Sequence, residues 1–374
     1  MFDGAFANRR ILVTGHTGFK GAWLCHWLER MGAQVTGLAL EPSTTPDLFS
    51  AIRLEDRVEH HICDIRDADS VEKIVQGCRP EMVFHLAAQP LVRESYQTPR
   101  ETFDVNVGGT VALLDALRHS DETRVCLVIT TDKCYENREW LWGYRESDAL
   151  GGHDPYSASK AAAEIAAASF RKSFFHSPDA MRLATVRAGN VIGGGDWSAD
   201  RIVVDFIKSI QAGQTLQLRN PNATRPWQHV LEPLSGYLTL ASMMWQSGGE
   251  DFAEAWNFGP PAESAWTVEQ LAREFVRVWG SGSISCPQLV GQPHEARFLK
   301  LDCSKAAARL HWSGVWNVRR TVEETVAWYR DFIADADMVE VTDRQVRAYT
   351  DDAVRQGMAW AGDESAPAVI RRAA

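Results

Sequence analysis

Residues 11–28, ILVTGHTGFKGAWLCHWL, decide the fold of this chain. An apolar run with strand character leads through Gly15, Gly18 and Gly21 into a segment with helical periodicity. The GxxGxxG spacing differs from GxGxxG, but the glycines have the same three roles in both patterns. One glycine allows a tight turn, one lets the backbone approach a pyrophosphate, and one lets the helix pack closely on the sheet. The amino terminus of that helix presents unpaired N–H groups to phosphates, so the stretch predicts a dinucleotide site.

Further apolar, β-branched runs recur up to residue 190, with helical segments between them. They are RRILVTG, AQVTGLAL, VEHHICDI, EMVFHLAA, RVCLVITT and MRLATVRAGN. Strands that alternate with helices at this spacing predict an α/β fold with a doubly wound, parallel, Rossmann-type sheet. After about residue 190 the pattern loosens. We therefore expect a dinucleotide-binding domain over residues 1–190 with later strands interleaved, a smaller substrate-binding lobe mainly over 191–360, and a loosely held tail over 361–374.

The composition is ordinary for a globular protein, with 45% hydrophobic and 24% charged residues. The formal net charge of −10 argues against a broad nucleic-acid surface. Seven cysteines without a CxxC pair favour a reducing compartment over a disulfide framework. The amino terminus lacks a signal-peptide pattern and no apolar run approaches the ~18 residues of a membrane span, so we expect a cytoplasmic protein without membrane contact. The histidine pair in EHHICD is more typical of a surface, and no metal site is expected.

The end of the second strand bears on the choice of cofactor. A carboxylate there would bind a ribose 2′-hydroxyl, but the position holds Ala39 or Leu40, and Glu41 comes a little late. The next arginine that could pair with a 2′-phosphate is Arg53, so the balance favours NAD over NADP. Asp64 is well placed for the adenine. The candidate cofactor contacts are Gly15, His16, Thr17, Gly18, Phe19, Lys20, Gly21, Asp64, Ile65, Leu86, Ala87, Ala88, Gln89, Thr130, Tyr156 and Lys160.

A tyrosine and a lysine one helical turn apart form the second motif. DPYSASKAAAEIAAASF places Tyr156 and Lys160 on one face of a helix. A phenol with its ordinary pKa of about 10 is a poor base at neutral pH, but a neighbouring ammonium group favours the phenolate. Thr131, at the end of the preceding strand, can hydrogen-bond the same substrate hydroxyl. The motif predicts removal of a proton from an alcohol while hydride passes to a nicotinamide.

Residues 130–137, TTDKCYEN, raise a separate question. Thr131, Asp132 and Lys133 place a hydroxyl, a carboxylate and an ammonium group directly after a buried strand. The triplet by itself could be a solvated turn. It could equally belong to a ligand site, because open α/β sheets bind ligands at the carboxyl ends of their strands.

The combination of GxxGxxG with YxxxK resembles the extended short-chain dehydrogenase/reductase superfamily over nearly the whole chain. Longer motifs are similar to those of the CDP-glucose 4,6-dehydratases, namely TGHTGFKGAWL, FHLAAQPLVRESY, TTDKCYEN, RAGNVIGGGDW, DRIVVDF, RPWQHVLEPLSGYL and PHEARFLKLDCSKA. The related dTDP-glucose dehydratases have glutamate where this chain has Lys133, and lysine there is typical of the CDP-sugar enzymes.

This resemblance implies a hydro-lyase with tightly bound NAD that converts CDP-D-glucose to CDP-4-dehydro-6-deoxy-D-glucose and water, for deoxysugar and lipopolysaccharide O-antigen biosynthesis. By family analogy, Tyr156, helped by Lys160 and Thr131, takes the C4 hydroxyl proton, Asp132 is the acid at C6, and Lys133 stands in the position of the C5 base. The alternatives are another nucleotide-sugar dehydratase or a 4-epimerase, and a non-catalytic NAD-sensing regulator. Asp132 and Lys133 count against an epimerase, and the retained Tyr156 and Lys160 count against a regulator.

The resemblance also implies substrate contacts and an assembly. The candidate substrate residues are Asn190, Arg201, Arg225 and His294, although each arginine could instead be an exposed surface charge. Trp197 and Trp227 could serve packing or ligand contact. The Ala- and Gly-rich segments VNVGGTVALLDALRHS and SASKAAAEIAAASFRKSF resemble the two helices that superfamily members pair into a four-helix bundle, so we expect a homodimer, or a tetramer built from it.

Overall fold

Seven parallel strands form the central sheet of the computed structural model, which describes residues 1–374 except 178, 261–264, 288–297 and 363–374. The strand order is β11-β6-β5-β4-β1-β2-β3, and the chain reverses direction across the sheet between β1 and β4. This is the arrangement of a doubly wound dinucleotide-binding sheet. The strands are β1 (Arg10–Thr14), β2 (Gln34–Ala39), β3 (Glu59–Ile62), β4 (Met82–His85), β5 (Val125–Ile129), β6 (Arg182–Arg187) and β11 (Ala255–Asn257).

Each of the six predicted runs contains one observed strand, so the predicted fold class is confirmed. The seventh strand, β11, was not predicted. It has only three residues, which is too short to show an alternating pattern, and it pairs in parallel with β6 about seventy residues earlier in the chain. Most of the predicted tail lies outside the described residues.

Helices cover both faces of the sheet, as the near-continuous apolar strands require. Ile11 and Val13 of β1 point into one hydrophobic core, and Leu12 between them points into the other. The first core is completed by α1 (Phe19–Arg30), α9 (Leu231–Trp245), α12 (Val318–Ile333) and α13 (Met338–Arg355). The second core is completed by α3 (Ala68–Cys78), α6 (Gly109–Leu117) and α7 (Pro155–Ser173).

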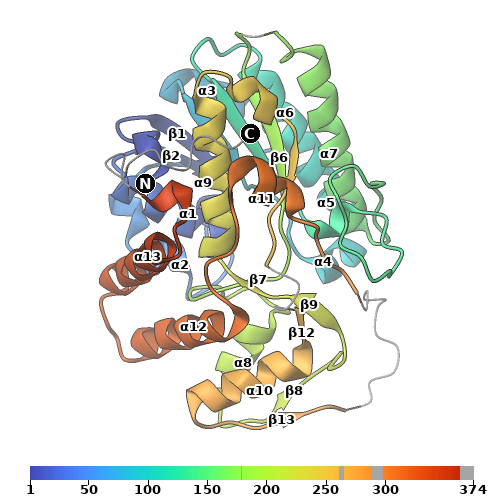
Figure 1. The fold of residues 1–374 in the computed structure, drawn as a ribbon, viewed down its shortest axis with the longest axis vertical. Coiled ribbons are helices and arrows are strands. Elements are labelled where there is room, and N and C mark those ends of the chain that lie inside the picture. The colour runs from blue at the N-terminus through green and yellow to red at the C-terminus, as the bar shows by residue number, and fades with distance from the viewer. Residues whose placement is uncertain (178, 261–264, 288–297, 363–374) are drawn as a thin grey trace.

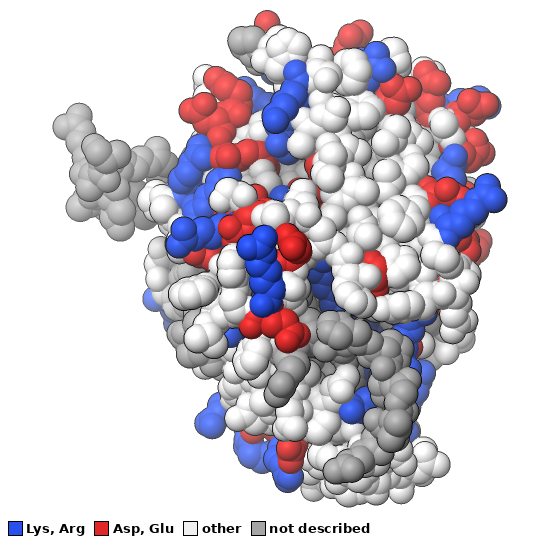
Figure 2. Space-filling view, turned by 90° about the vertical axis from the view of Figure 1, so that its right-hand side faces the viewer, with Lys and Arg blue, Asp and Glu red and all other residues white. Residues whose placement is uncertain are grey.

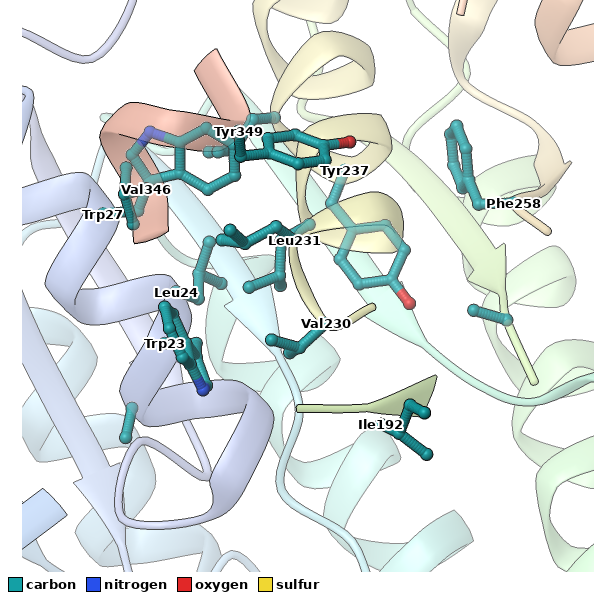
Figure 3. Packing of buried hydrophobic residues seen from close by; sticks show 14 of the residues in the cluster. Trp23, Leu24, Trp27, Ile192, Val230, Leu231, Tyr237, Phe258, Val346 and Tyr349 are labelled. Atoms are coloured by element: carbon teal, nitrogen blue, oxygen red, sulfur yellow. The ribbon is translucent and has the colours of Figure 1, made fainter. Parts of the chain in front are cut away.

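The first core joins the beginning of the chain to its end, as Figure 3 shows. Trp27 of α1 and Tyr349 of α13 meet edge to face, with ring centroids 6.0 Å apart. Leu231 of α9 packs beside them. Because α1 begins at the glycine turn, this packing holds the turn in place against a helix more than three hundred residues away in the sequence.

A smaller lobe lies beyond the carboxyl ends of the strands, at the bottom of Figure 1. The parallel pair β7 (Val191–Ile192) and β10 (Gln228–His229) leads into it. Its elements are α8 (Ile202–Gln211), α10 (Val268–Trp279), and the pairs β8 (Leu216–Gln217) with β13 (Ile284–Ser285) and β9 (Thr224–Pro226) with β12 (Ala265–Thr267). Between these segments the chain returns to the sheet through α9 and β11.

The remaining helices are α2 (Leu48–Ala51), α4 (Val92–Gln97), α5 (Pro99–Phe103) and α11 (Ser304–Leu310). Across the described ranges, none of the helices combines the length and the apolar character that a membrane span requires.

Candidate active site

The glycine turn between β1 and α1 has the geometry of a phosphate cradle. Gly15 has a φ of +76°, and a Cβ atom there would lie 2.7 Å from the backbone nitrogen of Ala87. A Cβ atom on Gly21 would overlap the carbonyl oxygen of Gly15. Gly18 caps α1 without a side-chain hydrogen bond, so the first N–H groups of the helix face outward without a capping acceptor. These features fit the pyrophosphate of a dinucleotide.

His16 and Thr17 support this turn through their side chains. The imidazole of His16 is fully buried, meets the ring of Phe49 edge to face, and lies 3.3 Å from Nδ1 of His60. Burial, and then the charge of His60, lower the pKa of His16 to about 4, so the ring is neutral. The Thr17 hydroxyl donates to the carbonyl oxygen of Leu40 at 2.9 Å. The structure thus packs the His16 imidazole against Phe49 and His60, and the contact of His16 with a cofactor stays a prediction.

The ends of β3 and β4 supply mainly backbone and small side chains. The Asp64 carboxylate accepts from Nε of Arg66 at 3.0 Å, and Arg66 lowers the pKa of Asp64. The Gln89 amide donates to the hydroxyl of Thr102 at 2.9 Å. The amide of Ala87 donates to the Thr14 hydroxyl at 3.1 Å, which holds the β4 loop against the glycine turn.

A buried ion pair lies directly behind the end of β5. Glu164 of α7 accepts from Nε and Nη2 of Arg187 at 2.9 and 2.8 Å, and both side chains are 3% exposed. The Thr130 hydroxyl also donates to Glu164, at 2.5 Å. The sequence placed Thr130 among the cofactor contacts, but its hydroxyl is turned into this cluster. The Thr130 hydroxyl points this way because α7, which carries Glu164, packs against β6, which carries Arg187.

We expect Glu164→Leu to lower the free energy of unfolding by about 3–5 kcal/mol, because an arginine cannot shed its proton and Arg187 would stay charged and buried. Urea titration measures the change. The matched control is Glu269→Leu in the exposed pair with Arg273, where we expect less than about 1 kcal/mol. Equal losses of unfolding free energy in the two variants would contradict the expected cost of leaving Arg187 charged, buried and unpaired.

Helix α7 begins so that Tyr156 faces the end of β5. Asp154 caps the helix by accepting from the amide of Ser157 at 2.9 Å, and Pro155 occupies the first helical position. One turn later, Nζ of Lys160 donates to the carbonyl oxygen of Ile129 at 3.1 Å. The predicted pair therefore lies beside the strand that carries the Thr-Asp-Lys triplet.

The triplet forms a short helical turn, Asp132–Cys134, capped by Thr131. The Thr131 hydroxyl donates to Oδ1 of Asp132 at 3.0 Å and accepts from the amide of Lys133 at 3.3 Å. Burial raises the pKa of Tyr156 to about 12, while a hydrogen bond with Thr131 and the charge of Arg201 act in the opposite direction. The sequence predicted a phenol with a lowered pKa, but the cost of burying its charge dominates.

Two buried ammonium groups have weakened proton affinity at this site. Burial, and then the charge of Lys20, lower the pKa of Lys160 to about 8. Burial, and then the charge of Arg201, lower the pKa of Lys20 to about 8, whereas Asp132 raises it. Lys20 follows the glycine turn and was expected only as a cofactor contact. Its interaction with Asp132 shows that the glycine turn and the β5 triplet face the same space.

Asn106 is a structural link that the sequence did not reveal. It lies in a π-helical turn, Asp104–Gly108, a geometry frequent at functional sites. Its Nδ2 atom donates to Oγ of Ser159 at 2.8 Å, and its Oδ1 atom accepts from the amide of Gln89 at 2.9 Å. Asn106 thereby connects the β4 loop to α7 next to Lys160. In the sequence, the only sign of this linking role was an asparagine inside a helical segment rich in Gly and Val.

A cavity of about 690 Å³ opens between the sheet edge and the smaller lobe. Lys133 lines it, as do Asp154 and Ser157 on either side of Tyr156. Its further cationic residues come from both parts of the molecule: Arg93, Arg201, Arg219 and Arg225. Carboxylates line the cavity as well, and some of them pair with these arginines: Asp196 with Arg201, and Asp200 and Asp205 with Arg219. A concave, partly apolar space with convergent charges is typical of a small-molecule site, and the arginines offer donors for an anionic group.

Three of the four expected substrate residues, Asn190, Arg201 and Arg225, line this cavity, and His294 lies outside the described residues. Asn190 has a φ of +46°, and among the described residues its buried Nδ2 atom has no hydrogen-bond partner. Arg93 and Arg219 were not predicted, since only the folded chain brings them to the cavity. Trp227 also lines the cavity, whereas Trp197 packs on Tyr329 with ring centroids 5.1 Å apart.

The geometry now defines the class of protein. Within the described part of the chain, no group of three or more His, Cys, Asp or Glu side chains could hold a metal ion. The site consists of a glycine turn that fits a dinucleotide, a tyrosine–lysine pair beside β5, and an adjacent cavity for a charged ligand. A Rossmann sheet with these features defines the short-chain dehydrogenase/reductase class of enzymes.

Within this class, the chain belongs to the GDP-mannose 4,6 dehydratase family, whose model matches residues 12–325. A CDP-glucose 4,6-dehydratase from Salmonella typhimurium is 48% identical over 354 residues, which cover 93% of this chain and 98% of that protein. This similarity confirms the resemblance inferred from the motifs.

Solved structures confirm the fold. A dTDP-glucose 4,6-dehydratase from Streptomyces venezuelae with NAD bound matches with a TM-score of 0.74 and 21% identity, covering 88% of this chain and 99% of that one. A UDP-glucose 4-epimerase from Thermotoga maritima with UDP-glucose matches with a TM-score of 0.73 and 22% identity, covering 86% and 99%.

Proposed function

We propose that this enzyme binds NAD and dehydrates CDP-D-glucose to CDP-4-dehydro-6-deoxy-D-glucose. One observation carries the proposal: Thr131 and Asp132 are hydrogen-bonded to each other at the end of β5, beside Tyr156, and Lys133 lines the adjacent cavity. An alcohol oxidation uses the tyrosine, and an elimination uses a second acid–base pair. The relative at 48% identity, named for this reaction, supports the choice of substrate.

NAD, when bound in the glycine cradle, would accept a hydride from C4 of the sugar and return it at C6. Tyr156 takes the proton of the C4 hydroxyl, and Thr131 hydrogen-bonds the same oxygen. Substrate and cofactor must offset the burial that keeps the phenol protonated in the free protein. Lys160, held on the carbonyl oxygen of Ile129, supplies positive charge beside the developing phenolate.

The elimination uses the next two residues of the triplet. A ketone at C4 acidifies the C5 proton, and Lys133 removes it as a neutral amine. A proton of the resulting ammonium group returns to C5 when the hydride is delivered to C6. Asp132 protonates the departing C6 hydroxyl, so water leaves. The diphosphate of the substrate is bound by guanidinium groups of Arg201 and Arg225 and by the Asn190 amide, which line the same cavity.

Incubation of the purified protein with CDP-, dTDP-, GDP- and UDP-glucose tests this function. We expect the 4-keto product, detected by its absorbance in alkali, with CDP-glucose well ahead of the others. A 4-epimer without loss of water would instead make the protein an epimerase. Preference for another base would keep the reaction and change the substrate. Stoichiometric NAD binding without turnover of any of them would favour a regulator.

We expect NAD to bind at least about tenfold more tightly than NADP, because no arginine is available for a 2′-phosphate after β2. Nη2 of Arg53 donates to Asp337 at 3.0 Å, and Arg66 is paired with Asp64. Calorimetry on protein stripped of cofactor measures both affinities. Equal affinities would refute the preference. Because the cofactor is recycled, no net reduced cofactor should accumulate during steady turnover.

We also propose a homodimer formed through α5, α6 and α7. Each of these helices carries an exposed apolar side chain, namely Phe103, Val111 and Ile165, and Ile165 is 60% exposed. Figure 2 shows the side of the molecule on which α7 lies, where much of the upper face is free of charged side chains. Such a face is suited to burial against a second copy.

Light scattering at micromolar concentration should give twice the mass of the chain. Ile165→Asp should yield a monomer, because it would bury an unpaired charge in the interface. Val354→Asp on α13, also exposed, is the matched control and should remain dimeric. A monomeric parent protein would rule out the dimer.

We also propose a division of the chain into domains and a location in the cell. The division into a cofactor domain over 1–190, a mainly substrate-binding lobe over 191–360 and a tail over 361–374 is supported by the cluster of small sheets and helices after residue 191. A cytoplasmic location is supported by seven cysteines that are all free thiols, as expected in a reducing compartment.

A further inference from the structure

Three buried polar atoms behind the β5 triplet lack a hydrogen-bond partner among the described residues. They are Oδ2 of Asp132, Oε1 of Gln228 and the hydroxyl of Tyr237. None of the three residues is more than 2% exposed. Each of these atoms loses its hydration on burial without compensation, so a partner shared by the three would stabilise all of them.

Gly189, which follows β6, lies between two of these groups. A Cβ atom on Gly189 would overlap Oδ2 of Asp132, so the carboxyl group rests directly on this stretch of backbone. Nε2 of Gln228 donates to the carbonyl oxygens of Gly189 at 3.1 Å and Phe258 at 3.2 Å. These two bonds hold the amide group of Gln228, with its unpaired Oε1 atom, beside the backbone of Gly189 and Phe258.

Tyr237 approaches from α9. Its ring meets the ring of Phe258 edge to face, with centroids 5.7 Å apart. Figure 3 shows its hydroxyl pointing away from α9, toward the side on which Ile192 lies. The phenol interacts electrostatically with both Asp132 and Tyr156, so its oxygen lies within range of the catalytic groups. Phe258 thus contacts both Tyr237 and Gln228, and Gly189 contacts both Gln228 and Asp132.

We propose that Asp132, Gln228 and Tyr237 together bind one water molecule, and that Gln228 and Tyr237 are thereby positioning residues for the Asp132 carboxyl group. The hydrogen bonds of the water close: it donates to Oδ2 of Asp132 and to Oε1 of Gln228, and it accepts from the Tyr237 hydroxyl. The acid proton of Asp132 then stays available for the C6 hydroxyl of the substrate. Thr131 already donates to Oδ1 of Asp132, so both oxygens of the carboxyl group become fixed. The inference rests on the proposed role of Asp132 in the elimination.

Crystal structures of the NAD-loaded parent and of Tyr237→Phe test the water itself. The phenylalanine keeps the ring contact with Phe258 and removes only the oxygen. We expect density for one ordered water within hydrogen-bond distance of all three atoms in the parent, and its loss or displacement in the variant. Direct bonds among the three side chains, or no density at that position, would overturn the proposal.

Kinetics test the consequence for catalysis. Tyr237→Phe should lower kcat about tenfold while KM for CDP-glucose stays within about twofold, because the carboxyl group is misplaced only at the elimination step. Oxidation at C4 should proceed, so reduced-cofactor absorbance should build up during turnover. A parental kcat without that absorbance would overturn the positioning role.

The control is Tyr349→Phe, which removes another buried hydroxyl in contact with α9. That hydroxyl bonds Glu232 at 2.8 Å and Ser235 at 3.0 Å, away from the triplet. Tyr349→Phe should reduce stability and leave kcat unchanged, and an equal fall in kcat would make the Tyr237 effect merely structural. If the parent turns over no nucleotide sugar, the proposed function fails, while the crystal structures still decide whether the water is bound.

Discussion

Lys133→Ala is expected to oxidise C4 of CDP-glucose but to lose the elimination, with kcat reduced by about 10²–10⁴. Lys133 lines the cavity directly after Asp132, at the carboxyl end of β5, where the C5–C6 side of the sugar must lie if C4 is at Tyr156. A lysine acts as a base only as a neutral amine, and burial or a nearby positive charge favours that form. Asp132 opposes it when ionised, so the scheme requires a protonated Asp132 or one turned toward the C6 hydroxyl.

Two measurements separate the steps in Lys133→Ala. Reduced-cofactor absorbance should appear and persist, because the oxidised sugar cannot go on to accept the hydride at C6. Mass spectrometry should show that solvent deuterium no longer enters C5. Lys172→Ala, at an exposed position of α7, is the control and should behave as the parent. If Lys133→Ala eliminates water at close to the parental rate, the base is another residue or a water molecule.

Tyr156→Phe should abolish the first step instead, with a fall in kcat of about 10³ or more and no reduced-cofactor signal. In the proposed mechanism the phenol oxygen accepts the C4 hydroxyl proton, and phenylalanine retains the ring of this 9% exposed residue while removing that oxygen. Stopped-flow absorbance after mixing with CDP-glucose follows the step directly.

The missing reduced-cofactor signal is informative only if Tyr156→Phe still binds cofactor and substrate. Calorimetry should therefore give parental affinities of Tyr156→Phe for NAD and for CDP-glucose. Lys133→Ala and Tyr156→Phe then differ in one measurement. Reduced-cofactor absorbance persists in the first variant and does not form in the second. Reduced cofactor formed by Tyr156→Phe at the parental rate would show that another group removes the C4 proton.

The local sequence pattern was enough to predict the strands of the sheet and the type of reaction. The six long strands have apolar runs, and the glycine turn has a spacing that only a close helix–strand approach requires. Tyr156 and Lys160 are fixed relative to each other by helical periodicity alone. Thr131, Asp132 and Lys133 are neighbours in the chain, so any fold that ends β5 there presents them together.

Long-range packing decided what lies around those groups. The Thr130 hydroxyl turns to Glu164 because α7 and β6 enclose a buried ion pair there. The pKa of the Tyr156 phenol is raised because the folded chain buries it, and no property of its neighbours in sequence predicts that degree of burial. Asn106 reaches the site through Gln89 and through Ser159 of α7, which is 53 positions away.

The sequence by itself thus determined the strands of the Rossmann sheet, the glycine turn, the tyrosine–lysine pair and the Thr131–Asp132–Lys133 triplet, because each depends on a pattern within a few residues. Only the tertiary structure decided the short edge strand β11, the burial of His16, the arrival of Arg93 and Arg219 at the cavity, and the contacts of Gln228 and Tyr237 with Phe258. These features join segments that are distant in the chain. Their positions follow from which apolar faces pack together, and local periodicity does not encode that choice.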